Sequence, residues 1–181
     1  MLDKFRSFAL GASIIIIILG IGAYLMIRMN GGESLLGARE GSLPAVNFSA
    51  LDYTADQPGY LMCDPAVCPS ATPDEAGVAF TVSRQKLRRT LVSFTDNTPT
   101  IRTLRMDIIH NQFDFTERLP GESFPSVIAV RILGTPAGDK AETASLALYS
   151  YSPMGSVTSP DHKARLQRWV RMIKARLNSP D

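Results

Sequence analysis

The fold of this chain is decided by the stretch SVIAVRIL, which occupies residues 126–133. Ile128, Val130 and Ile132 stand at every second position, and Ala129 and Arg131 separate them. Strict alternation of large apolar residues with other residues is typical of a strand that buries one face. The stretch therefore predicts a strand over 126–133, around which a sheet can be built.

Three further strands are expected on either side of this one. Residues 100–107 and 112–118 precede it, and residues 144–151 follow it. Phe113 with Phe115, and Leu146 with Leu148, repeat the two-residue period. The connections between these segments are too short to hold crossover helices, so neighbouring strands must run antiparallel. The sequence predicts a small antiparallel sheet of about four or five strands.

Two helices complete an α+β fold and are expected on one face of that sheet. The first runs from Arg84 to Phe94, behind Ser83 as the N-cap. Its Leu87 and Leu91 recur at helical spacing with Phe94, which gives one apolar stripe.

The second helix is predicted from Pro160 to Leu177, with Ser159 as the N-cap and Pro160 at the first helical position. Asp161 follows at the positive end of the helix dipole. An apolar stripe centred on Trp169 should pack on the sheet. The six basic residues are assigned to the flanks and the opposite face: Lys163, Arg165, Arg168, Arg171, Lys174 and Arg176.

The start of the chain predicts a membrane anchor. From Phe8 to Ile27 there is no charged residue, and a helix of this length spans the roughly 30 Å core of a bilayer. The apolar run is longer than the roughly 7–15 residues of a cleavable signal peptide, so an uncleaved signal anchor is favoured. The expected organisation is an anchor over residues 1–29, a linker over 30–60 and an α+β domain over 61–178.

The two cysteines, Cys63 and Cys68, bear on the cellular location. Two thiols this close, beside Pro65 and Pro69, suit a disulfide in an oxidising compartment, and free thiols are the alternative. Zinc would need further thiols or clustered histidines, so no metal or cofactor is expected. The pair favours a single-pass protein of the inner (cytoplasmic) membrane, with its C-terminal domain in the periplasm.

Three stretches of the C-terminal half resemble the domain of unknown function 1499 family of bacterial membrane-associated and envelope proteins. They are Glu117-Arg118 followed by Phe124-Pro125, the segment from Ser150 to Gly155, and the segment from Lys163 to Trp169. The resemblance implies a location and a scaffold, and the family has no established activity. The sequence departs from the family at four polar positions: Ser126, Tyr151, Thr158 and His162.

The predicted function is a non-catalytic binding or interaction module of the cell envelope. A Gly/Ser-containing loop, a helix N-terminus and basic residues converge between residues 151 and 165, which indicates a binding site. Its candidate residues are Tyr151, Ser152, His162, Lys163 and Arg165. The expected partners are the bilayer, through the span from Phe8 to Ile27, and an envelope protein or an anionic surface. Nucleic acid is not expected, because no aromatic residues interleave the basic ones as stacking platforms.

The alternative is a hydrolase or transferase that uses Asp161 and His162. A nearby serine such as Ser152 could complete a nucleophile–histidine arrangement. This hypothesis requires His162 to be exposed in a pocket, whereas no G-x-S-x-G elbow surrounds any serine.

Overall fold

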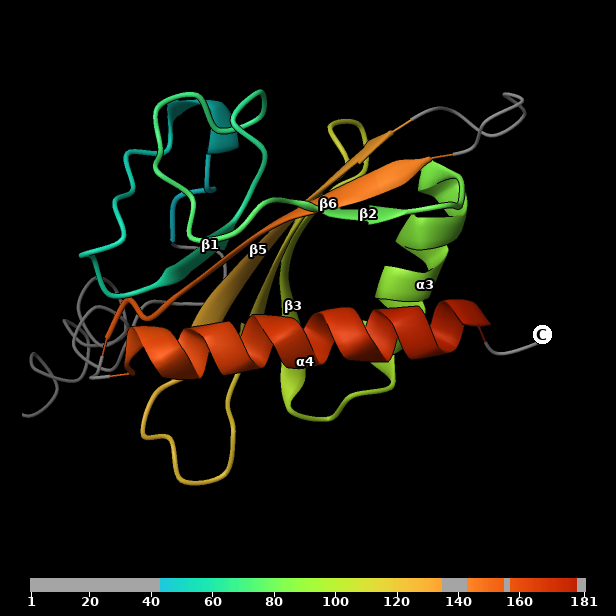
Figure 1. The fold of residues 1–181 in the computed structure, drawn as a ribbon. Coiled ribbons are helices and arrows are strands. Elements are labelled where there is room, and N and C mark those ends of the chain that lie inside the picture. The colour runs from blue at the N-terminus through green and yellow to red at the C-terminus, as the bar shows by residue number, and fades with distance from the viewer. Residues whose placement is uncertain (1–42, 135–142, 155–156, 179–181) are drawn as a thin grey trace, which may run out of the picture. The chain divides into compact units, whose positions relative to one another are not determined.

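The computed structural model describes residues 43–134, 143–154 and 157–178 (Figure 1). The predicted membrane span from Phe8 to Ile27 lies outside these residues, and so do residues 30–42 of the predicted linker. Within the described ranges, no helix has both the length and the hydrophobicity to cross a bilayer.

The described strands form one six-stranded antiparallel sheet, which confirms the predicted α+β class. The order along the sheet is β1-β6-β5-β4-β3, and β2 also pairs with β6 (Figure 1). The strands are β1 (Tyr60–Met62), β2 (Val78–Phe80), β3 (Ile101–Asp107), β4 (Gln112–Glu117), β5 (Ser126–Gly134) and β6 (Ala144–Tyr151).

The strands β1 and β2 were not predicted, and they raise the number of strands to six. Each has three residues, which is too short to display an alternating pattern. β1 pairs with residues 148–150 and β2 with residues 144–146, so the two short strands share the outer edge of β6. The pairing partner, and not local periodicity, determines their conformation.

Two helices pack on one face of the sheet: α3 (Arg84–Asp96) and α4 (Ser159–Asn178) (Figure 1). Leu87 and Leu91 of α3 meet Trp169 of α4 in one core, together with the apolar stripes of β4, β5 and β6. The indole ring of Trp169 lies 5.1 Å from the ring of Phe94 and 5.6 Å from that of Phe115. This core lies between the helices and the sheet, as the helical period of 3.6 residues and the strand period of two residues predicted.

The N-terminus of α4 begins one residue earlier than predicted. Thr158, not Ser159, is the N-cap, because its carbonyl accepts the first helical hydrogen bonds from Asp161 and His162. The Asp161 carboxylate in turn accepts from the Thr158 hydroxyl at 2.6 Å and from its backbone N–H at 3.3 Å. The carboxylate at N3 thus satisfies the N-cap backbone N–H, which is one half of a capping box, and the Asp161 side chain is occupied by this contact.

A second core covers the opposite face of the sheet and includes part of the predicted linker. Phe48 and Tyr53 are fully buried there against Ala129, Ala147 and Tyr149. Asn47 accepts a hydrogen bond from the backbone of Ser49 and so caps the short helix η2 (Phe48–Ala50). The packed part of the chain therefore extends N-terminal to residue 61, where the predicted domain began. Phe48 and Tyr53 are isolated aromatics in the sequence and form no periodic pattern.

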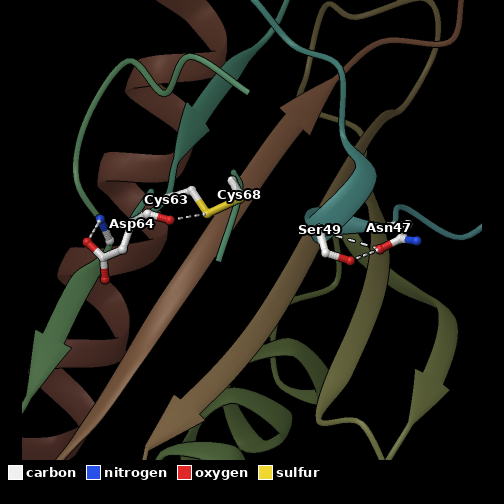
Figure 2. The surroundings of a disulfide bond; sticks show 6 residues. Asn47, Ser49, Cys63, Asp64 and Cys68 are labelled. Carbon is white, nitrogen blue, oxygen red and sulfur yellow. Dashed lines mark hydrogen bonds between the residues drawn. A yellow bond between two sulfur atoms is a disulfide. The ribbon is translucent and has the colours of Figure 1, made fainter. Parts of the chain in front are cut away.

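The disulfide between Cys63 and Cys68 is present, as predicted (Figure 2). Both half-cystines are buried in the second core. The carbonyl of Asp64 accepts backbone hydrogen bonds from Val67 and Cys68, which closes the intervening turn. The Asp64 carboxylate accepts from the backbone of Gly77, which ties the turn to the segment before β2.

Replacing both cysteines (Cys63→Ala with Cys68→Ala) should lower the free energy of unfolding by about 2 kcal/mol. This is the chain-entropy value for so short a loop. Denaturant unfolding of the oxidised wild type and of the variant measures the difference. The reduced wild type is the matched control and should resemble the variant; equal stability of the oxidised and reduced wild type would contradict the prediction.

Candidate functional site

A buried polar cluster lies where the apolar stripes of three neighbouring strands end. Glu117 continues the stripe of Phe113 and Phe115 on β4, and Ser126 and Ser150 continue those of β5 and β6. The register pairs Glu117 with Ser126, and Ile128 with Ser150, so these side chains share one end of the sheet. All three are at most 2% exposed. They were absent from the predicted site, although the continued two-residue period is a signal that could have found them.

The helix α4 contributes His162 and Arg165 to the same cluster. Both belong to its buried stripe, since His162 lies four residues before Leu166 and Arg165 lies four before Trp169. Arg165 is 1% exposed. Its prediction as a surface residue was wrong, because charge was given more weight than helical position.

Arg165 is held by two carboxylates and a hydroxyl. Its Nε lies 3.2 Å from Oε2 of Glu117, and its Nη2 pairs with Oε1 of Glu122. Its Nη1 donates to Ser126 Oγ at 2.8 Å. Such a guanidinium is buried at a large desolvation cost that only its partners offset. The side chain is therefore committed to the protein interior.

Glu117 is the shared acceptor of the cluster. Its Oε2 accepts from Nη2 of Arg168 at 2.6 Å and from the indole nitrogen of Trp169 at 3.1 Å. Arg165 Nε, although close to the same oxygen, makes no hydrogen bond to it. One carboxylate oxygen thus links Arg165, Arg168 and Trp169 of α4 to the end of β4.

His162 is fully buried and acts as a hydrogen-bond acceptor on Nδ1. Ser150 Oγ lies 2.8 Å from Nδ1, and Nη1 of Arg165 lies 3.4 Å from it. Because an arginine can only donate, these contacts assign the lone pair to Nδ1 and the proton to Nε2. Burial, and then the charge of Arg165, lowers the pKa of His162 to about 4.

This geometry does not suit the hydrolase or transferase hypothesis. Ser152 Oγ lies 3.5 Å from Nε2, the nitrogen that carries the proton, so His162 is not placed to accept the serine proton. Asp161 accepts hydrogen bonds from Thr158 and does not orient the imidazole. His162 is also closed to solvent, whereas the hypothesis needs it exposed.

The structure brings together only part of the predicted site. Ser152, His162 and Arg165 meet, and Ser152 Oγ is 3.0 Å from Ser126 Oγ. Tyr151 lies on the opposite face of the sheet, where its ring stacks on Tyr149 at 5.0 Å. Lys163 points toward β1 and forms an ion pair with Glu75 at 3.2 Å, over the ring of Tyr60.

A groove of about 760 Å³ lies beside the cluster, between α4 and the loops that follow β4 and β6. Phe124 and Met154, both 42% exposed, contribute apolar surface to it. Arg165, Arg168 and Arg171 also line the groove, but Arg165 and Arg168 are paired with carboxylates. The groove is therefore mixed in character and is not strongly cationic.

The charge of the described domain is concentrated on its two helices. α3 and α4 together carry ten Lys and Arg residues and two Asp residues. The other described residues carry four Arg and nine Asp or Glu. Both helices cover the same face of the sheet (Figure 1). That face is therefore positive in net charge, and the remainder of the described domain is negative.

No group of histidine, cysteine and carboxylate side chains in the described ranges has the geometry of a metal site. A scan against protein-family models finds no match for the sequence, and a search of curated proteins finds no relative.

Proposed function

We propose that this chain is a non-catalytic module of the bacterial cell envelope that docks on an anionic phospholipid surface. It is anchored in the inner membrane by residues 8–27, and its domain faces the periplasm. The docking surface is the outer side of α3 and α4. The observation that carries the proposal is the excess of basic residues on these helices, which carry nine Lys and Arg residues besides the buried Arg165 and only two Asp residues.

The sign and the position of this charge favour lipid head groups as the partner. Each basic residue near an anionic lipid surface contributes about 1 kcal/mol of attraction. The residues between the proposed anchor and the domain, 30–42, can extend at most about 45 Å. A domain held this close to a bilayer meets its surface at a high effective concentration. The disulfide supports an oxidising compartment.

The resemblance to the domain of unknown function 1499 family supports the same location. Its three stretches contribute Glu117, Ser150, Ser152 and Arg165 to the buried cluster. There Glu117 contacts Arg165, both Arg165 and Ser152 contact Ser126, and Ser150 contacts His162. We infer that the resemblance reflects a shared scaffold in which this cluster fixes the start of α4 on the sheet. The departures at Ser126 and His162 fall inside the cluster.

The test measures how close the outer side of α4 comes to the lipid surface. It uses a fluorescent label on this helix in the full chain, reconstituted in lipid nanodiscs. Met172 is 43% exposed on α4, so Met172→Cys can carry the label while the native cysteines remain in their disulfide. Energy transfer to a head-group acceptor should rise with the fraction of phosphatidylglycerol and fall with salt. Arg171→Gln with Lys174→Gln should weaken docking about thirty-fold, at about 1 kcal/mol per charge.

Two controls make the result specific to the helical face. A label at Ala50→Cys, on the short helix η2 of the opposite face, should give no lipid-dependent signal. Arg102→Gln with Arg131→Gln removes the same charge from the sheet and should leave docking unchanged. If that pair weakens docking as much, or if anionic lipid has no effect on the Met172 label, the proposal is refuted.

A further inference from the structure

A cationic groove lies between α3 and the C-terminal end of α4. It has a volume of about 540 Å³, and Lys86, Arg89 and Arg176 line it together with hydroxyl groups such as that of Ser93. No carboxylate lines this groove. Within the described residues, none of its three cations forms an ion pair, in contrast to Arg165 and Arg168. The groove therefore holds uncompensated positive charge.

Arg176 is fixed in position within the groove. Its Nη1 donates to the carbonyl of Ser93 at 3.0 Å and to the hydroxyl of the same residue at 3.2 Å. The guanidinium also lies over the ring of Phe94, 5.7 Å from its centre. A guanidinium that is already oriented loses less entropy when it binds an anion. The first turn of α3 contains no acidic residue, so the positive end of its dipole lies beside Lys86, while Arg176 offsets the negative end of the α4 dipole.

An apolar groove adjoins the cationic one on the other side of α3. It has a volume of about 500 Å³, and Val92, Met106, Ile108 and Phe113 provide its apolar walls. Arg88 and Asp96 also line it and add one charge of each sign. Arg89 and Ser93 line both grooves, so the two meet over the outer side of the helix. Met106 is 41% exposed and Ile108 is 59% exposed, an unusual degree of exposure for two neighbouring large apolar side chains.

We propose that this pair of grooves binds one molecule of an anionic amphiphile with a phosphate head group and a single acyl chain. Lys86, Arg89 and Arg176 hold the phosphate, and the chain crosses Ser93 into the groove of Met106 and Ile108. Each volume lies within the roughly 300–1,000 Å³ of small-molecule sites. This site rests on the proposed function and deepens it, because both involve anionic lipid. The pair of grooves binds one lipid molecule, whereas the outer side of α3 and α4 docks on a lipid surface.

The test is native mass spectrometry of the full chain released from micelles of a neutral detergent. The probes are lauroyl lysophosphatidic acid, lauroyl lysophosphatidylcholine with the same chain, and inorganic phosphate. The wild type should hold one lysophosphatidic acid more tightly than either other probe. Equal retention of lysophosphatidylcholine would overturn the role of the cations, and equal affinity for inorganic phosphate would overturn the role of the acyl chain.

Two variants with exposed substitutions separate the halves of the site. Lys86→Gln with Arg89→Gln should weaken lysophosphatidic acid binding about thirty-fold, if each cation contributes as it does near a lipid surface. Met106→Ser with Ile108→Ser should weaken the same probe and leave phosphate binding unchanged. The control is Arg102→Gln with Arg131→Gln, which removes two positive charges from the sheet and keeps the same membrane span. It should bind lysophosphatidic acid as the wild type does. Wild-type retention by both site variants refutes the site.

The outcome is distinguishable from that of the docking experiment. Met106→Ser with Ile108→Ser removes no charge, so it should leave the salt-sensitive docking of the Met172 label intact. Docking without specific retention of lysophosphatidic acid would refute the amphiphile site alone. Specific retention without docking would refute the proposed surface function alone and leave the site supported.

Discussion

Replacing Arg165 with methionine is expected to lower the free energy of unfolding by about 3–5 kcal/mol. Methionine approximates the length of the arginine stem, but it removes the buried cation beside Glu117, which is 2% exposed and keeps its pair with the partly exposed Arg168. Glu122 loses its partner as well. Removing one partner of a buried charge cluster leaves the remaining charges less compensated, so the loss includes the cost of the Glu117 and Glu122 carboxylates that stay behind. Denaturant unfolding followed by the fluorescence of the single tryptophan, Trp169, measures it.

Three variants test this explanation of the loss. Arg171→Met removes an exposed arginine from the same helix and should change the stability by no more than about 0.5 kcal/mol. Adding Glu117→Gln to Arg165→Met should recover part of the loss, because the buried negative charge that Arg165 compensated is then absent. Arg165→Lys keeps the charge without the planar fork and should fall between wild type and methionine. If Arg165→Met costs no more than Arg171→Met, the cluster does not stabilise the fold as described.

The sequence predicted the architecture correctly wherever apolar residues recurred at one spacing over several helical turns or along a whole strand. The four strands predicted by alternation are β3 to β6, and their bounds differ from the prediction by one residue at most. The helix predicted from Arg84 to Phe94 ends two residues later than expected. Where the conformation depends on a distant partner, as in β1, β2 and the segment around Phe48, no local signal exists.

Only part of the candidate site was predicted from the sequence. The chemical type of a residue and its position in the strand or helix period led to different predictions of which side chains meet. Tyr151 is adjacent in sequence to Ser150 and Ser152, but a strand turns neighbouring side chains to opposite faces. Lys163 follows His162 by one residue, and a helix places it about 100° away. Arg165 satisfied the helical period of the core and was excluded only because it is charged. Extending the two periods through polar residues would have found Glu117, Ser126, Ser150 and Arg165 together.

The stability of the domain should fall as the pH is lowered from 6.5 toward 4, and His162 should account for much of the loss. In the unfolded chain its pKa is about 6.5. In the folded chain burial and the neighbouring Arg165 lower the pKa to about 4. Between these values the unfolded chain binds a proton that the folded chain excludes, so acid favours unfolding. The contribution is complete above pH 6.5 and decreases by about 2 kcal/mol between pH 7.5 and pH 5.

The free energy of unfolding is measured at pH 7.5 and pH 5 for the wild type and for His162→Asn. The variant keeps all carboxylates, so the difference between the two proteins isolates the contribution of His162. The variant should lose about 2 kcal/mol less over the interval. Nitrogen chemical shifts of the imidazole should in addition show the proton on Nε2 at pH 5.5, since Nδ1 accepts from Ser150 and Arg165. Equal pH dependence of variant and wild type would mean that His162 takes up a proton in the folded state. A base that can be protonated 3.5 Å from Ser152 would then remove one of the objections to the hydrolase or transferase hypothesis, so this measurement also tests that alternative.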